Sequence, residues 1–274
     1  MYYQKVDLYE YFGVERKGGE SGYLYTYIPE SPDYPSRKRP AILVIAGGGY
    51  AFVSPREKEC VALAYVAKGF SAFTLEYSVA PVVFPVQLIE GAMAMAYIRE
   101  NAEKFGVKSD KVAVIGFSAG GHLAGMLATL FDRAEIKVAL KERAAMVRPD
   151  AAILSYPVIS GGEVAHANSF INLFGKDDAK LREEFSLENC VTEKSSPAFI
   201  WTTTDDGCVP AENSLLMATA YKIAGVPFEL HIFESGVHGL SLATAETGFI
   251  NEPVQKWLEL SLTWLLGRGF TLND

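Results

Sequence analysis

A serine between two glycines, Ser118 in Gly116-Phe-Ser-Ala-Gly120, is the residue of this chain best placed to act as a nucleophile. An apolar stretch at residues 111–115 precedes it, and a helical pattern at residues 119–130 follows it. This is the context of a nucleophile elbow, in which the serine takes a strained backbone conformation and the glycines leave room for the turn to close. We therefore predict Ser118 as the nucleophile. The alternative is a serine that only caps a turn between strand and helix.

A serine hydroxyl needs a base to remove its proton, and the chain offers four histidines. His238 follows the last strand pattern in Ser235-Gly-Val-His-Gly239, a loop that can present a side chain at the edge of a sheet, and we predict it as the base. We expect His122 to pack along the helix after Ser118. His231 lies within a strand pattern, which favours a structural role, and His166 lies in a polar stretch.

The base in turn needs an acid that orients it. Asp205 and Asp206 directly follow the apolar stretch at residues 198–202, between Ser118 and His238 in the sequence. We predict Asp206 as this acid because it begins the spacing Asp-x-x-Val-Pro, and we expect Asp205 to cap a helix or support the loop. The alternative is that both aspartates cap the helix that begins near Pro210.

Attack of a serine on an acyl group places negative charge on the carbonyl oxygen, which preorganised backbone N–H groups can stabilise. The first long apolar stretch ends in Ala46-Gly-Gly-Gly-Tyr50, where bare backbone can approach such an oxygen. We predict the N–H groups of Gly48, Gly49 and Ala119 as the donors. A flexible loop or a phosphate cradle are the alternatives, but the lysine and hydroxyl of a Walker motif do not follow.

The three cysteines, Cys60, Cys190 and Cys208, show no CxxC spacing. We therefore predict reduced thiols, with neither a disulfide framework nor a cysteine zinc site. Cys208 lies close to Asp206 and is a rival nucleophile, but Ser118 is preferred because its expected partners are present.

Short apolar stretches of strand type alternate with helical patterns along the chain. This alternation predicts an α/β fold: a doubly wound, mostly parallel sheet with helices on both faces. The strand-type stretches are residues 22–28, 41–46, 71–77, 111–115, 151–155, 198–202 and 228–233, and the helical patterns are residues 55–68, 86–105, 119–130, 211–224 and 253–266.

The length of 274 residues fits one domain, because α/β folds often reach this size as a single unit. Residues 160–192 are polar and irregular, with one helical pattern at 178–185, and this stretch is longer than an ordinary connection. We predict that it forms a small lid inserted in a single domain spanning residues 1–274. Residues 29–40, rich in Pro, Ser and charge, are predicted as a surface loop.

The composition is that of a globular protein, with 49% hydrophobic and 21% charged residues. A net charge of −8 argues against binding nucleic acid or an anionic membrane, since both need a concentrated basic surface. The sequence contains no apolar run of signal-peptide or membrane-span length. We therefore expect a cytoplasmic protein with no nucleic-acid or membrane partner.

Five segments, in this order, resemble the esterases of the hormone-sensitive-lipase and acetylxylan-esterase branches of the α/β-hydrolase superfamily. The resemblance implies hydrolysis of carboxylic esters, often with short acyl groups and sometimes with acetyl groups on sugars, without a metal or organic cofactor. The segments are Gly47-Gly-Gly-Tyr50, Leu75-Glu-Tyr-Ser-Val-Ala-Pro81 with Phe84-Pro85, Gly116-Phe-Ser-Ala-Gly-Gly-His-Leu-Ala124, Asp205-Asp-Gly-Cys-Val-Pro210 with Glu212-Asn-Ser214, and Gly236-Val-His-Gly-Leu240.

Two positions depart from the pattern of this family. Ala46 stands where a histidine usually precedes the glycines, and Ser78 stands where an arginine often follows the tyrosine. Because the expected oxyanion donors are backbone groups, the change at Ala46 should alter the support of the loop more than the donors themselves.

The predicted function is therefore a serine carboxylesterase that acts on small soluble esters, among them acetyl groups on sugars such as xylo-oligosaccharides. A serine peptidase or amidase with the same triad, and a noncatalytic small-molecule receptor, are the alternatives. A homodimer is left open, through an uncovered edge strand or an apolar face of the last helix around Trp257, Leu258 and Leu265.

Overall fold

The predicted apolar stretches form seven of the eight strands of one sheet in the computed structural model, which describes residues 1–30 and 36–272. The surface loop predicted at residues 29–40 therefore lies partly outside the described residues. The strand order is β1-β2-β4-β3-β5-β6-β7-β8. The strands are β1 (Tyr2–Asp7), β2 (Tyr23–Ile28), β3 (Arg39–Ile45), β4 (Ser71–Glu76), β5 (Val107–Phe117), β6 (Ala151–Ser155), β7 (Ala198–Thr203) and β8 (Phe228–Phe233).

Strand β2 pairs antiparallel with β1 and β4, and the other neighbouring pairs are parallel. The helices are α1 (Leu8–Phe12), α2 (Glu59–Val66), α3 (Val86–Glu100), α4 (Ala119–Thr129), α5 (Ala134–Leu140), α6 (Ala167–Phe174), α7 (Ala179–Glu184), α8 (Glu212–Ala224) and α9 (Glu252–Leu266). Short 3-10 helices are η1 (Pro55–Glu57), η2 (Lys141–Met146), η3 (Leu187–Asn189) and η4 (Ala245–Thr247).

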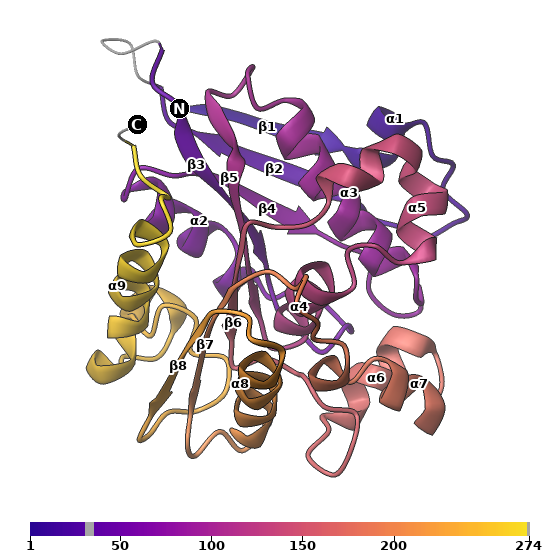
Figure 1. Ribbon diagram of the computed structural model, residues 1–274, viewed down its shortest axis with the longest axis vertical. Helices are drawn as coiled ribbons and strands as arrows, with labels where there is room; N and C mark the ends of the chain where they lie inside the picture. Colours follow the sequence, from indigo (N-terminus) through magenta and orange to yellow (C-terminus); the bar gives the residue numbers. More distant parts are fainter. Residues whose placement is uncertain (31–35, 273–274) are drawn as a thin grey trace.

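The central strands are buried on both faces, which explains their unbroken apolar sequence. Within β3, Leu43 packs in a cluster with residues of α3, α4 and α8, whereas its neighbour Val44 packs in a second cluster with residues of α2 and α9. Figure 1 shows α2 and α9 on one side of the sheet and α3, α4 and α8 on the other. The predicted doubly wound, mostly parallel α/β sheet is confirmed.

The sequence did not predict β1, α1, α5 or α6. Strand β1 lies at the edge of the sheet and buries only Val6, so its sequence carries no apolar run. The three helices have only five to eight residues, too few for a helical period to stand out. The predicted helix at residues 55–68 is divided, because the backbone at Lys58 leaves the helical region between η1 and α2.

Parallel strands place several loops at one edge of the sheet. Residues 46–49 follow β3, Ser118 follows β5, Asp206 follows β7 and His238 follows β8, all at the carboxyl ends of the strands. Ligands of α/β sheets bind at this edge because the loops there converge. The fold therefore gathers the predicted site residues at one place.

Residues 160–192 contain α6, α7 and η3, and Figure 1 shows α6 and α7 side by side at one end of the molecule. On α9, Trp257 and Leu265 are fully buried against the sheet of their own chain, so they do not form an exposed apolar face. Among the described helices, none is long and apolar enough to cross a membrane.

Candidate active site

Ser118 sits in a turn that has no room for a side chain at positions 116 and 120. Its backbone lies at φ 53° and ψ −119°, a strained conformation for a residue with a side chain. A Cβ atom at Gly116 would lie 2.1 Å from the carbonyl oxygen of Gly120, and one at Gly120 would lie 2.3 Å from that of Ala46. The two glycines are therefore needed for the turn to close against β3.

The structure brings Ser118, His238 and Asp206 into one hydrogen-bonded chain. His238 Nε2 lies 2.8 Å from Ser118 Oγ, and His238 Nδ1 lies 2.7 Å from Asp206 Oδ2. Because the Asp206 carboxylate accepts a hydrogen bond from Nδ1–H, the neutral imidazole presents Nε2 as an acceptor to the serine hydroxyl. These are the contacts that general-base activation of a serine requires.

The acid is itself held in place by its own loop. Asp206 Oδ1 accepts the backbone N–H groups of Cys208 and Val209, both at 2.9 Å, which leaves Oδ2 directed at His238. Asp205 instead accepts the N–H of Gly236 at 2.5 Å and so supports the loop that carries His238. Neither aspartate caps α8, which begins after Ala211 without a side-chain cap.

The glycine loop presents backbone donors to the same site. Among residues 1–30 and 36–272, the N–H groups of Gly48 and Gly49 have no protein acceptor. Gly48 has φ +122°, and a Cβ there would lie 2.1 Å from the carbonyl oxygen of Phe52, so only glycine fits. Ala119 is the first residue of α4, and its N–H therefore lacks an acceptor within that helix.

Two of the remaining histidines have partners away from the serine. His122 Nδ1 lies 3.0 Å from the hydroxyl of Tyr50, and Nε2 lies 2.9 Å from the carbonyl oxygen of Phe185. Burial lowers the pKa of His122 to about 4, so the ring is neutral over most of the pH range. His231, on β8, lies 2.6 Å from Glu229 through Nε2.

A cavity of about 330 Å³ opens over Ser118 and His238. Its other walls come from the glycine loop, from η1 and from the start of α6, with Phe52, Arg56, Glu57, His166, Asn168, Asn172 and Cys208 among the lining residues. A cavity of this size suits a small ligand. A larger cavity, of about 570 Å³, lies beside α8, and none of the predicted site residues lines it.

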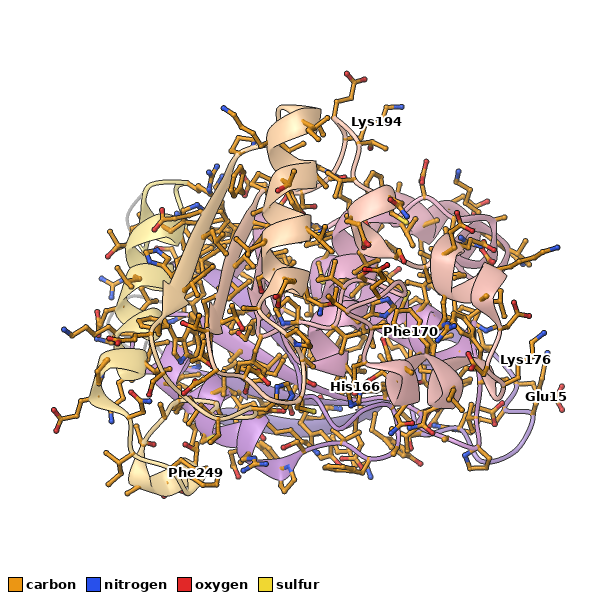
Figure 2. The ribbon with its side chains drawn as sticks, turned by 90° about the horizontal axis from the view of Figure 1, so that it is seen from below. Glu15, His166, Phe170, Lys176, Lys194 and Phe249 are labelled. Carbon is orange, nitrogen blue, oxygen red and sulfur yellow. The ribbon has the colours of Figure 1, made fainter. Side chains whose placement is uncertain are left out.

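His166 and Asn172 enter the site from the start and the body of α6, and no motif in the sequence points to either residue. His166 Nδ1 lies 2.8 Å from Ser169 Oγ, and Asn172 donates to the carbonyl oxygen of Gly49 at 2.8 Å. Burial and the nearby His238 lower the pKa of His166. Figure 2 shows His166 toward the middle of the molecule, whereas Lys176, beyond the end of α6, lies at its rim. Only the position of α6 in the fold reveals this contribution.

Glu57 also contributes to the site, although the sequence did not indicate it. Its side chain is buried, and its oxygens accept the N–H of Gly47 at 2.8 Å and the hydroxyl of Tyr156 at 2.6 Å. In the sequence it is one of two acids in the helical pattern at residues 55–68, and acidic side chains usually face solvent.

Ala46 and Ser78, the two positions that depart from the family pattern, each form hydrogen bonds with nearby residues. The carbonyl oxygen of Ala46 accepts the hydroxyl of Tyr77 at 2.8 Å, which supports the glycine loop from behind. Ser78 donates its N–H and its hydroxyl to the buried carboxyl group of Glu90.

Within the described part of the chain, no group of three or more His, Cys, Asp or Glu side chains is placed to hold a metal ion.

The doubly wound sheet and the serine at the turn after β5 define an α/β hydrolase. The chain belongs to the BD-FAE family, whose family model matches residues 27–221. The resemblance to α/β-hydrolase esterases that the five motifs indicated is confirmed.

Two curated relatives are similar to this chain in sequence. Endo-1,4-beta-xylanase B of Butyrivibrio fibrisolvens is 40% identical over 217 residues, which cover 76% of this chain and 34% of the relative. Acetylxylan esterase of Xylanibacter ruminicola is 31% identical over 228 residues, covering 81% of this chain and 44% of the relative. The chain thus spans less than half the length of both curated relatives.

Among solved structures, an acetyl ester-xyloside bifunctional hydrolase from Caldicellulosiruptor lactoaceticus superposes with a TM-score of 0.82. It is 40% identical, and the match covers 90% of this chain and 88% of that chain. Similarity to this structure therefore extends over nearly the whole of both chains.

Proposed function

We propose that this protein is a serine carboxylesterase that hydrolyses small soluble esters, including acetyl groups on sugars such as xylo-oligosaccharides. The observation that carries the proposal is the hydrogen-bonded chain from Ser118 through His238 to Asp206 at the floor of a small cavity. Similarity to proteins named acetylxylan esterase and acetyl ester-xyloside hydrolase supports acetylated sugars as the substrate class.

In the first half of the proposed reaction, Ser118 Oγ attacks the ester carbonyl carbon while His238 Nε2 takes its proton. The negative charge on the carbonyl oxygen is met by the N–H groups of Gly48, Gly49 and Ala119. Each such donor stabilises the transition state by about 3 kcal/mol. The carbon–oxygen bond to the alcohol then breaks, the alcohol leaves with the proton from His238, and Ser118 retains the acyl group.

In the second half, water replaces the alcohol. His238 takes a proton from the water as it attacks the acyl carbon, and returns it to Ser118 Oγ as the carboxylic acid leaves. Asp206 holds the imidazole in the tautomer with hydrogen on Nδ1 and stabilises the imidazolium that forms in each half. Because its other oxygen is fixed by two backbone N–H groups, its orientation is set before substrate binds.

The size and the lining residues of the cavity favour a substrate with a small acyl group and a sugar-like alcohol. The volume of about 330 Å³ favours short acyl chains over long ones. Phe52, at the mouth, is 58% exposed and offers an aromatic face, while His166, Asn168 and Asn172 offer polar groups from α6. We propose that residues 160–192 form a small cap within a single domain and that this cap shapes the alcohol side.

Self-association is a separate part of the proposal. The edges of the sheet are β1 and β8, whereas Trp257 and Leu265 on α9 are buried within the chain. We therefore propose that a homodimer would form through an edge strand and not through α9.

The test compares substrates on one purified protein. We expect release of acetate from p-nitrophenyl acetate and from acetylated xylo-oligosaccharides, with rates that fall for p-nitrophenyl esters of longer acyl chains. Aminoacyl p-nitroanilides should be cleaved far more slowly; faster cleavage of these would indicate the peptidase or amidase alternative. A fluorophosphonate probe should label the protein but not Ser118→Ala. Absence of both labelling and hydrolysis would favour a noncatalytic receptor.

A further inference from the structure

Glu57 is a buried carboxyl group beside the candidate active site that the proposed reaction does not use. It ends the 3-10 helix η1, lines the cavity over Ser118 and is only 3% exposed. Its two oxygens accept from two uncharged donors, the N–H of Gly47 and the hydroxyl of Tyr156. Burial raises the pKa of Glu57, while the hydrogen bonds from Tyr156 and Gly47 oppose that rise.

A carboxyl group in this environment lowers stability compared with a well-packed apolar side chain, because burial removes its hydration. What Glu57 adds is a connection between two loops that are far apart in the sequence. One is the loop of Gly47, Gly48 and Gly49, and the other is the loop that carries His238.

The connection to the glycine loop runs through Gly47. A Cβ atom at Gly47 would lie 2.9 Å from Ser118 Cβ and 2.7 Å from the carbonyl oxygen of Phe117, so this backbone packs directly on the elbow. Its N–H is committed to Glu57 Oε2 at 2.8 Å. Fixing this N–H orients the backbone just before Gly48, whose own N–H is a proposed oxyanion donor.

The connection to the His238 loop runs through Tyr156. Its hydroxyl donates to Glu57 Oε1 and accepts the N–H of Ser241 at 2.9 Å. Its ring centroid lies 5.0 Å from that of His238, at an interplanar angle of 69°. Tyr156 therefore contacts the base with its ring and holds the loop three residues further on with its hydroxyl.

We propose that Glu57 is a positioning residue, whose carboxyl group holds the oxyanion loop through Gly47 and the His238 loop through Tyr156 at a fixed geometry around Ser118. The inference rests on the proposed function, because it assigns Glu57 to the transition state of that reaction. A displacement of about 1 Å in such groups can lower a rate by about 100-fold.

Glu57→Gln is the variant that tests it. Glutamine keeps the size of the side chain, but it offers one acceptor oxygen to two donors, so one of the two contacts is lost. We expect kcat for p-nitrophenyl acetate to fall by about 10- to 100-fold while KM changes by less than about threefold. The rate is expressed per active site, counted by titration with a fluorophosphonate, so that partial unfolding lowers the number of sites and not kcat.

Tyr156→Phe provides a second, independent test, since it keeps the ring against His238 and removes only the hydroxyl. We expect the same kind of loss in kcat. Both variants disrupt the same connection between the glycine loop and the His238 loop. The fold-loss of kcat in the double variant should therefore be smaller than the product of the two single fold-losses. If Glu57→Gln fails to fold, the kcat and KM of Tyr156→Phe decide the question.

Glu90→Gln and Tyr9→Phe are the matched controls. Glu90 is fully buried and accepts hydrogen bonds from Ser78 and Tyr9, but it does not line the cavity over Ser118. These controls should keep kcat per site within about twofold.

Three outcomes would overturn the inference: unchanged kcat per site in Glu57→Gln, unchanged kcat per site in Tyr156→Phe, or equal losses in the matched controls. Each leaves the proposed function standing, provided that the wild-type protein hydrolyses the ester and Ser118→Ala does not. Failure of the wild-type protein to hydrolyse any ester overturns the proposed function itself.

Discussion

His238 Nε2 lies 2.8 Å from Ser118 Oγ although 120 residues separate them in the sequence. Ser118 follows β5 and His238 follows β8, and two strands stand between these in the sheet. Three strand spacings amount to about 14 Å, so the loop after β8 must extend back across the edge of the sheet. Asp205 holds this loop through Gly236, and Tyr156 holds it through Ser241.

Removal of the base His238 should abolish hydrolysis, whereas removal of His231, on the strand β8 that precedes it, should not. We expect His238→Ala to lower kcat/KM for p-nitrophenyl acetate by at least about 10³-fold. His231→Ala is the control, since its ring pairs with Glu229 and lies outside the cavity. It should retain activity and lower only the midpoint of urea unfolding, and the reverse pattern would exchange the two roles.

The two adjacent aspartates should differ sharply in their effect on rate. Asp206→Asn replaces the acceptor at His238 Nδ1 and favours the wrong tautomer, so we expect kcat to fall by about 10³- to 10⁴-fold. Asp205→Asn keeps an oxygen that can accept the N–H of Gly236, and kcat should stay within about tenfold. Steady-state kinetics at saturating ester measures both. Similar losses in the two variants would contradict the assignment of Asp206.

Two neighbouring glycines offer a steric test of the oxyanion loop. At Gly48, alanine would place a Cβ 2.1 Å from a backbone oxygen at φ +122°, so the loop must move. We expect Gly48→Ala to lower kcat by at least about 100-fold. At Gly49, φ is +63°, and the nearest atoms outside the adjoining residues, on His166 and Ser169, lie 3.9 Å from the added Cβ.

Gly49→Ala should therefore cost about 1 kcal/mol of unfolding free energy and keep kcat within about tenfold. Ester kinetics and urea unfolding on the same samples separate the two effects. Equal activity in the two alanine variants would argue against a role for the Gly48 N–H.

Cys208 should make the enzyme sensitive to bulky thiol reagents. It is exposed, and its side chain lines the cavity beside Ser118 and His238, whereas Cys60 and Cys190 are only partly exposed. Burial and the nearby Asp206 raise the pKa of Cys208, so modification should be faster at higher pH. We expect a large maleimide to inactivate the protein by blocking the cavity. Cys208→Ser should be active and resistant, and its inactivation at the wild-type rate would contradict the prediction.

Glu90 should make the protein less stable as the pH rises. Burial raises the pKa of Glu90 from 4.5 to about 7, so the folded state binds more protons than the unfolded chain between these values. Stability from this group is present at low pH and is lost as the pH rises from about 4.5 to about 7. The difference corresponds to about 3 kcal/mol.

Urea unfolding at pH 4.5 and pH 7 of the wild-type protein and of Glu90→Gln measures this effect. The wild-type protein should lose more stability over this interval than the variant does. The same change in both proteins would show that Glu90 does not contribute to it.

Much of the fold and of the candidate site could be predicted because the signals are local. Strands buried on both faces have short apolar sequences, and their alternation with helical patterns predicts the doubly wound sheet that the structure contains. Glycine at position 116 is required by the carbonyl oxygen of Gly120 in the same turn, whereas glycine at position 120 is required by Ala46, which follows β3. Asp206 is predicted from the spacing Asp-x-x-Val-Pro after a strand, and His238 from its place between glycines after the last strand. The edge strand β1 and the short helices were missed because they bury little surface and span too few residues for a period.

The sequence by itself determined the fold class, the elbow at Ser118 and its candidate partners, since steric demands within a turn and the alternation of apolar runs act over a few residues. Only the tertiary structure decided that Asp205 supports the His238 loop, that His166 and Asn172 reach the cavity from α6, and that α9 buries Trp257. It also decided that Glu57 joins Gly47 to Tyr156, two residues more than 100 positions apart. Such contacts depend on how loops that are distant in the sequence pack at one edge of the sheet, and local sequence patterns do not predict this packing.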